Sequence, residues 1–205
     1  MLVPSVKNLI FDLGGVILDL SVDHTLEAFA RVANLPKAEV QDLYVSTPGF
    51  LQYEKGAMDD HAFRNFVRAT FSISADEATI DDCWNAMLRG IPPIKLDLLL
   101  RLQSEFRVFL LSNTNAIHLE HINGGMLPHQ KTLDEYFHKA YYSHRMGKRK
   151  PDADIFEQVL EENNLLPEET LFLDDYAVNI EGAKVLGIKT VHVTSPNLIL
   201  EYFHA

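Results

Sequence analysis

Polar residues of types that do chemistry stand directly after three short apolar runs of this chain. Asp12, Ser112 and the pair Asp174 and Asp175 each follow a run of three apolar residues. Such runs are typical of strands in a parallel sheet that is covered on both faces. Ligands bind at the carboxyl ends of such strands, so we expect these side chains to meet in one crevice. One carboxylate there could act as a nucleophile, and the others could hold a metal ion.

The elements that would position these residues follow from the apolar pattern. Strands are predicted at residues 6–11, 107–111, 140–143, 170–173 and 189–193. Helices are predicted at residues 152–163, just after Pro151, and at residues 179–186, before Gly187. From about residue 22 to residue 100, apolar side chains recur at helical spacing between prolines and glycines. This stretch predicts a helical insertion.

Composition limits the classes of protein to which the chain can belong. A chain of 205 residues with 47% hydrophobic residues can bury a full core. The net charge of −11 argues against a nucleic-acid partner, because the phosphate backbone requires a basic face. No apolar stretch approaches the roughly 20 residues of a membrane helix, so we expect a cytoplasmic protein with no membrane partner. Cys83 is the single cysteine, which excludes an internal disulfide and predicts a small buried side chain.

Four short motifs lie at the ends of these elements, in the order Asp12-Leu13-Gly14-Gly15-Val16, Ser112-Asn113-Thr114, Lys150-Pro151 and Asp174-Asp175. In this order and spacing they resemble the motifs of the haloacid dehalogenase-like (HAD) hydrolase superfamily, over almost the whole chain. The neighbouring residues are similar to those of bacterial α-D-glucose-1-phosphate phosphatases. The resemblance implies an α/β fold: a Rossmann-like, doubly wound parallel sheet core at residues 1–18 and 93–205, with a small α-helical cap, residues 19–92, inserted after the first strand.

The resemblance also implies a phosphomonoesterase that depends on Mg²⁺ and acts on small sugar phosphates, with glucose 1-phosphate as a candidate. Asp12, which we expect in a solvated crevice, would be the nucleophile and form an aspartyl phosphate. The metal would bind Asp12, the backbone carbonyl of Gly14, and Asp175 or Asp174. A cation is needed there because a carboxylate repels a phosphate dianion.

The phosphoryl group would be held by the second and third motifs. Ser112 and Asn113 would bind its oxygens, and Lys150 would bind them and neutralise the charge that builds up in the transition state. Ser112 and Lys150 would therefore join Asp12 as catalytic residues. The partner would be a small-molecule phosphate ester, and the chain would be a monomer or a homodimer.

Gly14 is a departure from the superfamily pattern. Most phosphatases that resemble this chain carry a second Asp at this position, as general acid and base, and losing such a group typically costs about 10²–10⁴-fold in rate. An acidic leaving group or a metal-bound water could compensate. Two alternatives stay open: a 2-haloacid dehalogenase, which needs no metal, and a phosphate-binding regulatory protein without turnover. The adjacent carboxylates Asp174 and Asp175 argue against the dehalogenase.

Other residues are weighed against ordinary structural roles. His24, Tyr53 and Glu54 of the cap are candidates for substrate contact, with ordinary positions on the cap surface as the favoured alternative. In the basic run before Pro151, Lys148 and Arg149 are expected on the surface. The histidines of the second half show no metal-ligand spacing and are expected to be solvated; the residues concerned are His118, His121, His129, His138 and His144.

Overall fold

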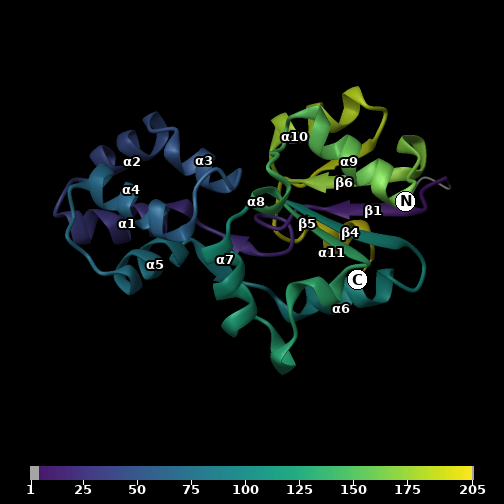
Figure 1. The fold of residues 1–205 in the computed structure, drawn as a ribbon. Helices are drawn as coiled ribbons and strands as arrows, with labels where there is room; N and C mark the ends of the chain where they lie inside the picture. The colour runs from purple at the N-terminus through teal and green to yellow at the C-terminus, as the bar shows by residue number, and fades with distance from the viewer. Residues whose placement is uncertain (1–4, 205) are drawn as a thin grey trace.

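Five parallel strands form the main sheet within residues 5–204, the part of the chain described by this computed structural model (Figure 1). They are β1 (Asn8–Phe11), β4 (Arg107–Ser112), β5 (Lys139–Tyr142), β6 (Thr170–Asp174) and β7 (Lys189–His192). Their order across the sheet is β5-β4-β1-β6-β7. The chain therefore builds outward from β1, first to one side and then to the other, which confirms the predicted doubly wound α/β core.

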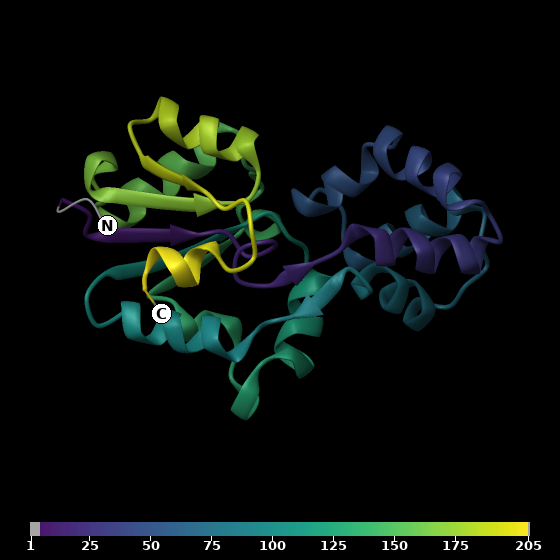
Figure 2. The same cartoon turned by 180° about the vertical axis from the view of Figure 1, so that it is seen from behind.

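Helices cover both faces of this sheet, because successive residues of each strand point to opposite sides and both sides are apolar. Ile10 and Phe172 pack on the face covered by α9 (Ala153–Asn163) and α10 (Ala177–Val185). Leu9 packs on the opposite face, which is covered by α6 (Pro93–Leu102) and α11 (Leu198–Tyr202). Figures 1 and 2 show the two helical layers above and below the strands.

The predicted helical insertion forms a bundle beyond the carboxyl ends of the strands (Figure 1). It contains α1 (Val22–Ala33), α2 (Lys37–Ser46), α3 (Gly49–Glu54), α4 (Asp60–Phe71) and α5 (Glu77–Asn85). Aromatic side chains hold the bundle together: Tyr53 stacks on Phe63 at 3.9 Å between ring centroids, and Phe50 stacks on Trp84 at 5.6 Å. Cys83 is buried among them, as predicted. The exact boundaries of cap and core stay a prediction.

Two short strands join the bundle to the core. β2 (Asp19–Leu20) and β3 (Leu88–Gly90) pair antiparallel, on the two chain segments that enter and leave the bundle. These strands are absent from the predicted elements because two or three residues cannot display an alternating pattern. At this joint the buried Lys95 of α6 forms an ion pair with Asp19, at 3.0 Å between Nζ and Oδ1.

The remaining elements are short. They are α7 (Ala116–His121) with the π-helical turn Ile122–Met126, α8 (Ser143–Met146), and the 3-10 turns Pro128–Gln130, Leu133–Tyr136 and Pro167–Glu169. The two helices predicted after Pro151 and before Gly187 correspond to α9 and α10, within two residues at each end. Among the helices of residues 5–204, none combines the length and the apolar character needed to cross a membrane.

Candidate active site

The carboxyl ends of the central strands bring three carboxylates together. Asp12 follows β1, whereas Asp174 ends β6 and Asp175 follows it. One oxygen from each of the three lies within 4.8 Å of the other two. β1 and β6 are adjacent and in register, with Phe11 opposite Leu173, and this pairing puts their ends side by side. The crevice predicted from the apolar runs is therefore present.

Lys150 lies at the centre of this carboxylate cluster, in the loop before α9. Its Nζ is 2.7 Å from Asp12 Oδ1 and 2.6 Å from Asp174 Oδ2, and its side chain is only 1% exposed. Burial favours the neutral amine, yet the two carboxylates raise the pKa of Lys150, so the ammonium stays charged. A buried charge left with no partner typically costs about 3–5 kcal/mol, and Lys150 has two partners that each prevent this. These three side chains therefore hold one another in place.

The side chain of Asn113 fixes the backbone of Lys150. Asn113 Nδ2 donates to the Lys150 carbonyl and Asn113 Oδ1 accepts from the Lys150 amide, both at 3.0 Å. With its amide group engaged in this way, Asn113 can offer a ligand its backbone N–H. Ser112, at the end of β4, is buried and lines the same cavity as Asp12. The second and third motifs are thus linked directly to each other.

Asp174 and Asp175 have different surroundings. Both oxygens of Asp174 are engaged, by Lys150 Nζ, by the Tyr176 amide at 2.7 Å and by Asn179 Nδ2 at 3.0 and 3.1 Å. Asp175 is an exposed residue, and its carboxylate lies against Gly15. Partial burial and the neighbouring Asp174 raise the pKa of Asp175. The structure thus gives Asp174 the surroundings of an orienting group and leaves the Asp175 carboxylate open to the crevice.

Asp12 is more buried than expected. The prediction of a solvated crevice is wrong at this residue, which is 8% exposed. Burial raises the pKa of Asp12 from 3.8 to about 7, against the opposing effect of Lys150 and with a further increase from Asp174. A cation bound among the three carboxylates would favour the ionised form. The hydrophobic strand end, where β1 is covered by its neighbours, explains the burial.

The two glycines after Asp12 differ in backbone conformation and in the space around them. Gly15 has a φ of +73°, and a Cβ atom there would lie 2.1 Å from Asp175 Oδ2. Glycine is therefore required at Gly15 both by the backbone and by the neighbouring carboxylate. Gly14 has no such φ, and a Cβ atom there would meet only Leu20, at 3.2 Å from Cδ2. The absence of a side chain at Gly14 is thus not imposed by the turn.

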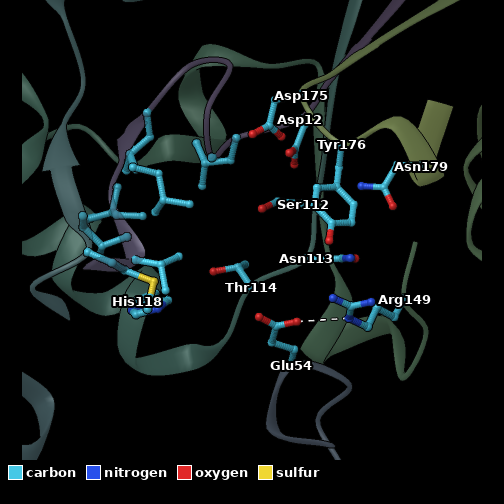
Figure 3. A pocket seen from close by; sticks show the side chains of 18 of the residues that line it. Asp12, Glu54, Ser112, Asn113, Thr114, His118, Arg149, Asp175, Tyr176 and Asn179 are labelled. Atoms are coloured by element: carbon cyan, nitrogen blue, oxygen red, sulfur yellow. Dashed lines mark hydrogen bonds and ion pairs between the residues drawn. The ribbon is translucent and has the colours of Figure 1, made fainter. Parts of the chain in front are cut away.

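A cavity of about 530 Å³ opens from these residues toward the helical bundle (Figure 3). One part of its wall is polar and includes Asn113, Thr114, Glu54 and Arg149. Another part is apolar; its residues are Leu18, Leu20, Val22, Met87, Leu88 and Ile122. A pocket with an anionic end and a mixed wall suits a small ligand that carries both a charged group and a larger organic part.

Glu54 of the bundle and Arg149 of the core form an ion pair in the wall of this cavity. The distance from Arg149 Nε to Glu54 Oε2 is 3.1 Å, and Figure 3 shows the pair facing the cavity. Burial raises the pKa of Glu54, and Arg149 partly offsets this shift. The expectation that Arg149 is a surface residue holds only in part: its side chain is 29% exposed, but it also lines the cavity and bonds to Glu54 and to the Lys150 carbonyl. Nothing in the local sequence distinguishes it from Lys148.

The other cap candidates do not line this cavity. The Tyr53 hydroxyl donates to Asp60 at 2.7 Å and accepts from the Ile117 amide at 3.3 Å. His24 is exposed, with its Nδ1 2.8 Å from Ser21 Oγ. His118, in contrast, does line the cavity and is buried, so the expectation that it is solvated is wrong. Its contacts from the bundle are with Trp84 and Asn85 of α5, which is remote in the sequence.

The donor set of the cluster fits a hard divalent cation. It offers carboxylate oxygens from Asp12 and Asp175, next to the backbone of Gly14, and oxygen ligands are those that Mg²⁺ prefers. Mg²⁺ also keeps several waters, and the open cavity leaves room for them.

Comparisons with known proteins agree with this arrangement. D-ribitol-5-phosphate phosphatase from Bacteroides thetaiotaomicron is 31% identical over 189 residues, which cover 90% of this chain and 90% of that protein. A solved HAD family enzyme from Bacteroides thetaiotaomicron, in complex with magnesium and inorganic phosphate, superposes with a TM-score of 0.84 and 36% identity, and the match covers 91% of this chain and 93% of that one. A predicted HAD-like family hydrolase from Porphyromonas gingivalis superposes with a TM-score of 0.85 and 32% identity. This match covers 94% of this chain and 91% of that one.

A family can be assigned from a match that extends over most of the chain. A family model described as haloacid dehalogenase-like hydrolase matches residues 6–187, which include all four motifs. With the doubly wound sheet and the carboxylates at its edge, this match shows that the chain belongs to the haloacid dehalogenase-like hydrolase family.

Proposed function

We propose that this protein is a Mg²⁺-dependent phosphomonoesterase that acts on small sugar or polyol phosphates through an aspartyl phosphate on Asp12. One observation carries the proposal. A buried lysine, Lys150, holds Asp12 and Asp174 at hydrogen-bond distance, while Asp175 stands open beside them. The cluster combines a candidate nucleophile, Asp12, with the ammonium group of Lys150 and a further open carboxylate, Asp175.

The reaction would proceed in two displacements. An oxygen of Asp12 forms a bond to phosphorus while the bond from phosphorus to the leaving oxygen breaks, and the leaving alkoxide takes a proton from water and leaves hydroxide in solvent. A water molecule then attacks the phosphorus of the acyl phosphate and gives its proton to solvent hydroxide, while the bond from phosphorus to the Asp12 oxygen breaks; this returns the Asp12 carboxylate and inorganic phosphate. Lys150 neutralises charge on the phosphoryl oxygens, and Ser112 with the backbone amide of Asn113 holds them. Because Gly14 supplies no acid, the leaving group depends on solvent for its proton.

The metal would be held by Asp12, by Asp175 and by the backbone carbonyl of Gly14. When bound, Mg²⁺ would offset the repulsion between Asp12 and a phosphate dianion. Asp174 is the less suitable ligand, because Lys150, Tyr176 and Asn179 already engage its oxygens. We therefore assign Asp174 to the orientation of Lys150.

The choice of sugar and polyol phosphates rests on the mixed wall of the cavity and on the likeness to D-ribitol-5-phosphate phosphatase. The pair Glu54 and Arg149 offers both an acceptor and donors for hydroxyl groups. Glucose 1-phosphate, suggested by the sequence motifs, and D-ribitol 5-phosphate differ in leaving group: the first is an anomeric and the second a primary alkyl phosphate. Both belong in the substrate panel.

The two alternatives predict different behaviour. A 2-haloacid dehalogenase needs no metal, and its carboxylate substrate would be repelled by Asp12, Asp174 and Asp175, which Lys150 offsets only in part. A phosphate-binding protein without turnover would bind esters and leave them intact. Metal-dependent release of inorganic phosphate separates the three functions.

The experiment measures phosphate release from glucose 1-phosphate, glucose 6-phosphate, D-ribitol 5-phosphate and an aryl phosphate. We expect no turnover in EDTA, recovery with Mg²⁺, and a loss of more than about tenfold in Asp12→Asn. Asp175→Asn should weaken Mg²⁺ binding, whereas Asp174→Asn should lower turnover at every Mg²⁺ concentration. Full activity in EDTA would point to the dehalogenase, and binding without phosphate release would point to the regulatory protein.

A further inference from the structure

His118 is a buried histidine at the wall of the cavity, on the side away from the carboxylates. It lies on α7, it is 6% exposed, and its ring stacks on Trp84 of α5 with 4.9 Å between centroids and an interplanar angle of 11°. Figure 3 shows it across the cavity from Asp12 and Asp175, with Thr114 between them. A ligand with its phosphate at Asp12 would direct its other end toward His118.

One nitrogen of this ring has a partner and the other has none among the described residues. Nδ1 lies 2.8 Å from Asn85 Oδ1, which can only accept a hydrogen bond, so the proton is on Nδ1. Nε2 therefore carries a lone pair, and it is buried without a hydrogen-bond partner within residues 5–204. Burial lowers the pKa of His118 to about 3, which keeps the ring neutral. A neutral acceptor suits an uncharged donor such as a hydroxyl group.

A second unpartnered polar atom belongs to the same cluster. Asn115 Oδ1 accepts from the His118 amide at 3.0 Å and from Trp84 Nε1 at 3.3 Å, whereas Asn115 Nδ2 is buried with no partner in the described part of the chain. The cluster thus offers one free acceptor and one free donor. A hydroxyl group both donates and accepts, and leaving such buried groups unpaired costs free energy.

Access to His118 Nε2 requires a side chain to move, because the atom is covered. Met87 lines the same cavity, and its unbranched thioether side chain can change rotamer at low cost. The ring itself contributes to the cavity wall. A ligand that supplies the missing donor could therefore offset the cost of this rearrangement.

We propose that His118 determines specificity at the leaving-group end of the cavity, where its Nε2 accepts a hydrogen bond from a hydroxyl group of a polyhydroxylated phosphate ester. This inference rests on the proposed phosphatase function and goes beyond it, because it states how the enzyme distinguishes hydroxylated from apolar leaving groups. A site that hydrogen-bonds a substrate hydroxyl discriminates against analogues that lack it.

The test compares D-ribitol 5-phosphate with n-pentyl phosphate, which has the same carbon chain and phosphate but no hydroxyl groups. The variants are His118→Asn, whose amide can replace Nδ1 but not Nε2, and His118→Gln, whose amide can reach the place of Nε2. We expect His118→Asn to lower the ratio of kcat/KM for the two esters about tenfold, the effect of one uncharged hydrogen bond. His118→Gln should keep the ratio within about threefold of wild type.

Two features make this ratio informative. It does not depend on the fraction of folded enzyme, since both esters are measured on one preparation. His121→Asn is the matched control, because His121 is exposed on the same helix, and it should leave the ratio unchanged. An unchanged ratio in His118→Asn, which includes an equal loss of kcat/KM for both esters, would show a purely structural role and overturn the inference.

Binding to the Asp12→Asn protein separates this inference from the proposed function. Calorimetry with the two esters, in Mg²⁺, should give a preference for D-ribitol 5-phosphate that the added change His118→Asn reduces about tenfold. If wild type releases no phosphate from any ester, the phosphatase proposal fails while this preference can still appear. No preference between the two esters would overturn the role of His118.

Discussion

The side chain of Leu20 fills the space next to Gly14 that a longer residue at that position would enter. Leu20 Cδ2 lies 3.2 Å from the place of a Cβ atom on Gly14, and Leu20 belongs to β2, the strand that leads into the helical bundle. Most phosphatases that resemble this chain carry an acid at that position. Here an apolar side chain from the joint between core and bundle lies beside Gly14, two residues after the proposed nucleophile Asp12.

Gly14→Asp should restore an acid near the leaving group. The turn tolerates the change, because Leu20 is 41% exposed and can shift by the few tenths of an ångström required. Without an acid, the wild-type rate should fall steeply as the leaving group becomes less acidic, and the variant should raise kcat/KM for glucose 6-phosphate at least tenfold relative to glucose 1-phosphate. Gly14→Asn has the same size without a titratable proton, and it should lack this effect. Equal wild-type rates on the two esters would contradict the expected dependence on leaving-group acidity.

Gly15→Ala should damage the metal site. At a φ of +73° its new methyl group would lie 2.1 Å from Asp175 Oδ2, so the Asp175 carboxylate must move. We expect Mg²⁺ affinity, measured by calorimetry, to fall more than about tenfold, in the range seen when metal-site geometry is disturbed. Gly147→Ala is the control: its φ is +66° with nothing within 4 Å of the new atom, so it bears the same backbone strain. Equal Mg²⁺ affinity in the two variants would contradict the prediction.

Asp12→Asn should stabilise the protein at alkaline pH in EDTA. Burial raises the pKa of Asp12 from 3.8 to about 7, so the folded state holds this proton more tightly than the unfolded state. Stability therefore falls as pH rises from about 4 to about 7, and the full cost is present above that range. The variant removes this cost and leaves Lys150 paired with Asp174, so its melting temperature should exceed that of wild type by on the order of 3–6 °C at pH 8.

The pH dependence is the decisive part of this measurement. The gain in melting temperature should shrink as pH falls from 7 toward 4, because the wild-type carboxyl group becomes protonated in the folded state as well. Thermal unfolding of both proteins at pH 5 and pH 8 gives the comparison. A gain of equal size at the two pH values would mean that lost packing or hydrogen bonds, and not the buried charge, set the difference.

The sheet and the meeting of the four motifs could be predicted from the sequence because their signals are local. Each strand is a continuous apolar run, and each chemical residue follows its run directly, so the shared edge of a parallel sheet brings Asp12, Ser112 and Asp174 together. The two short strands between core and bundle, β2 and β3, could not be predicted, because elements of two or three residues carry no periodic signal of their own.

The division of roles within the site depended on tertiary contacts. Arg149 stands beside Lys148 in a basic run, and only its pairing with Glu54, 95 residues away, places it in the cavity. His118 resembles its neighbour His121 in sequence, yet Trp84 and Asn85 of the bundle bury it and engage one of its nitrogens. The sequence by itself determined where the motif residues at the strand ends lie, because each follows a local apolar run that forms a strand. The rest of the cavity was decided only by the tertiary structure, because its wall is formed where the bundle packs against the core, and contacts between segments so far apart leave no pattern in the residues on either side.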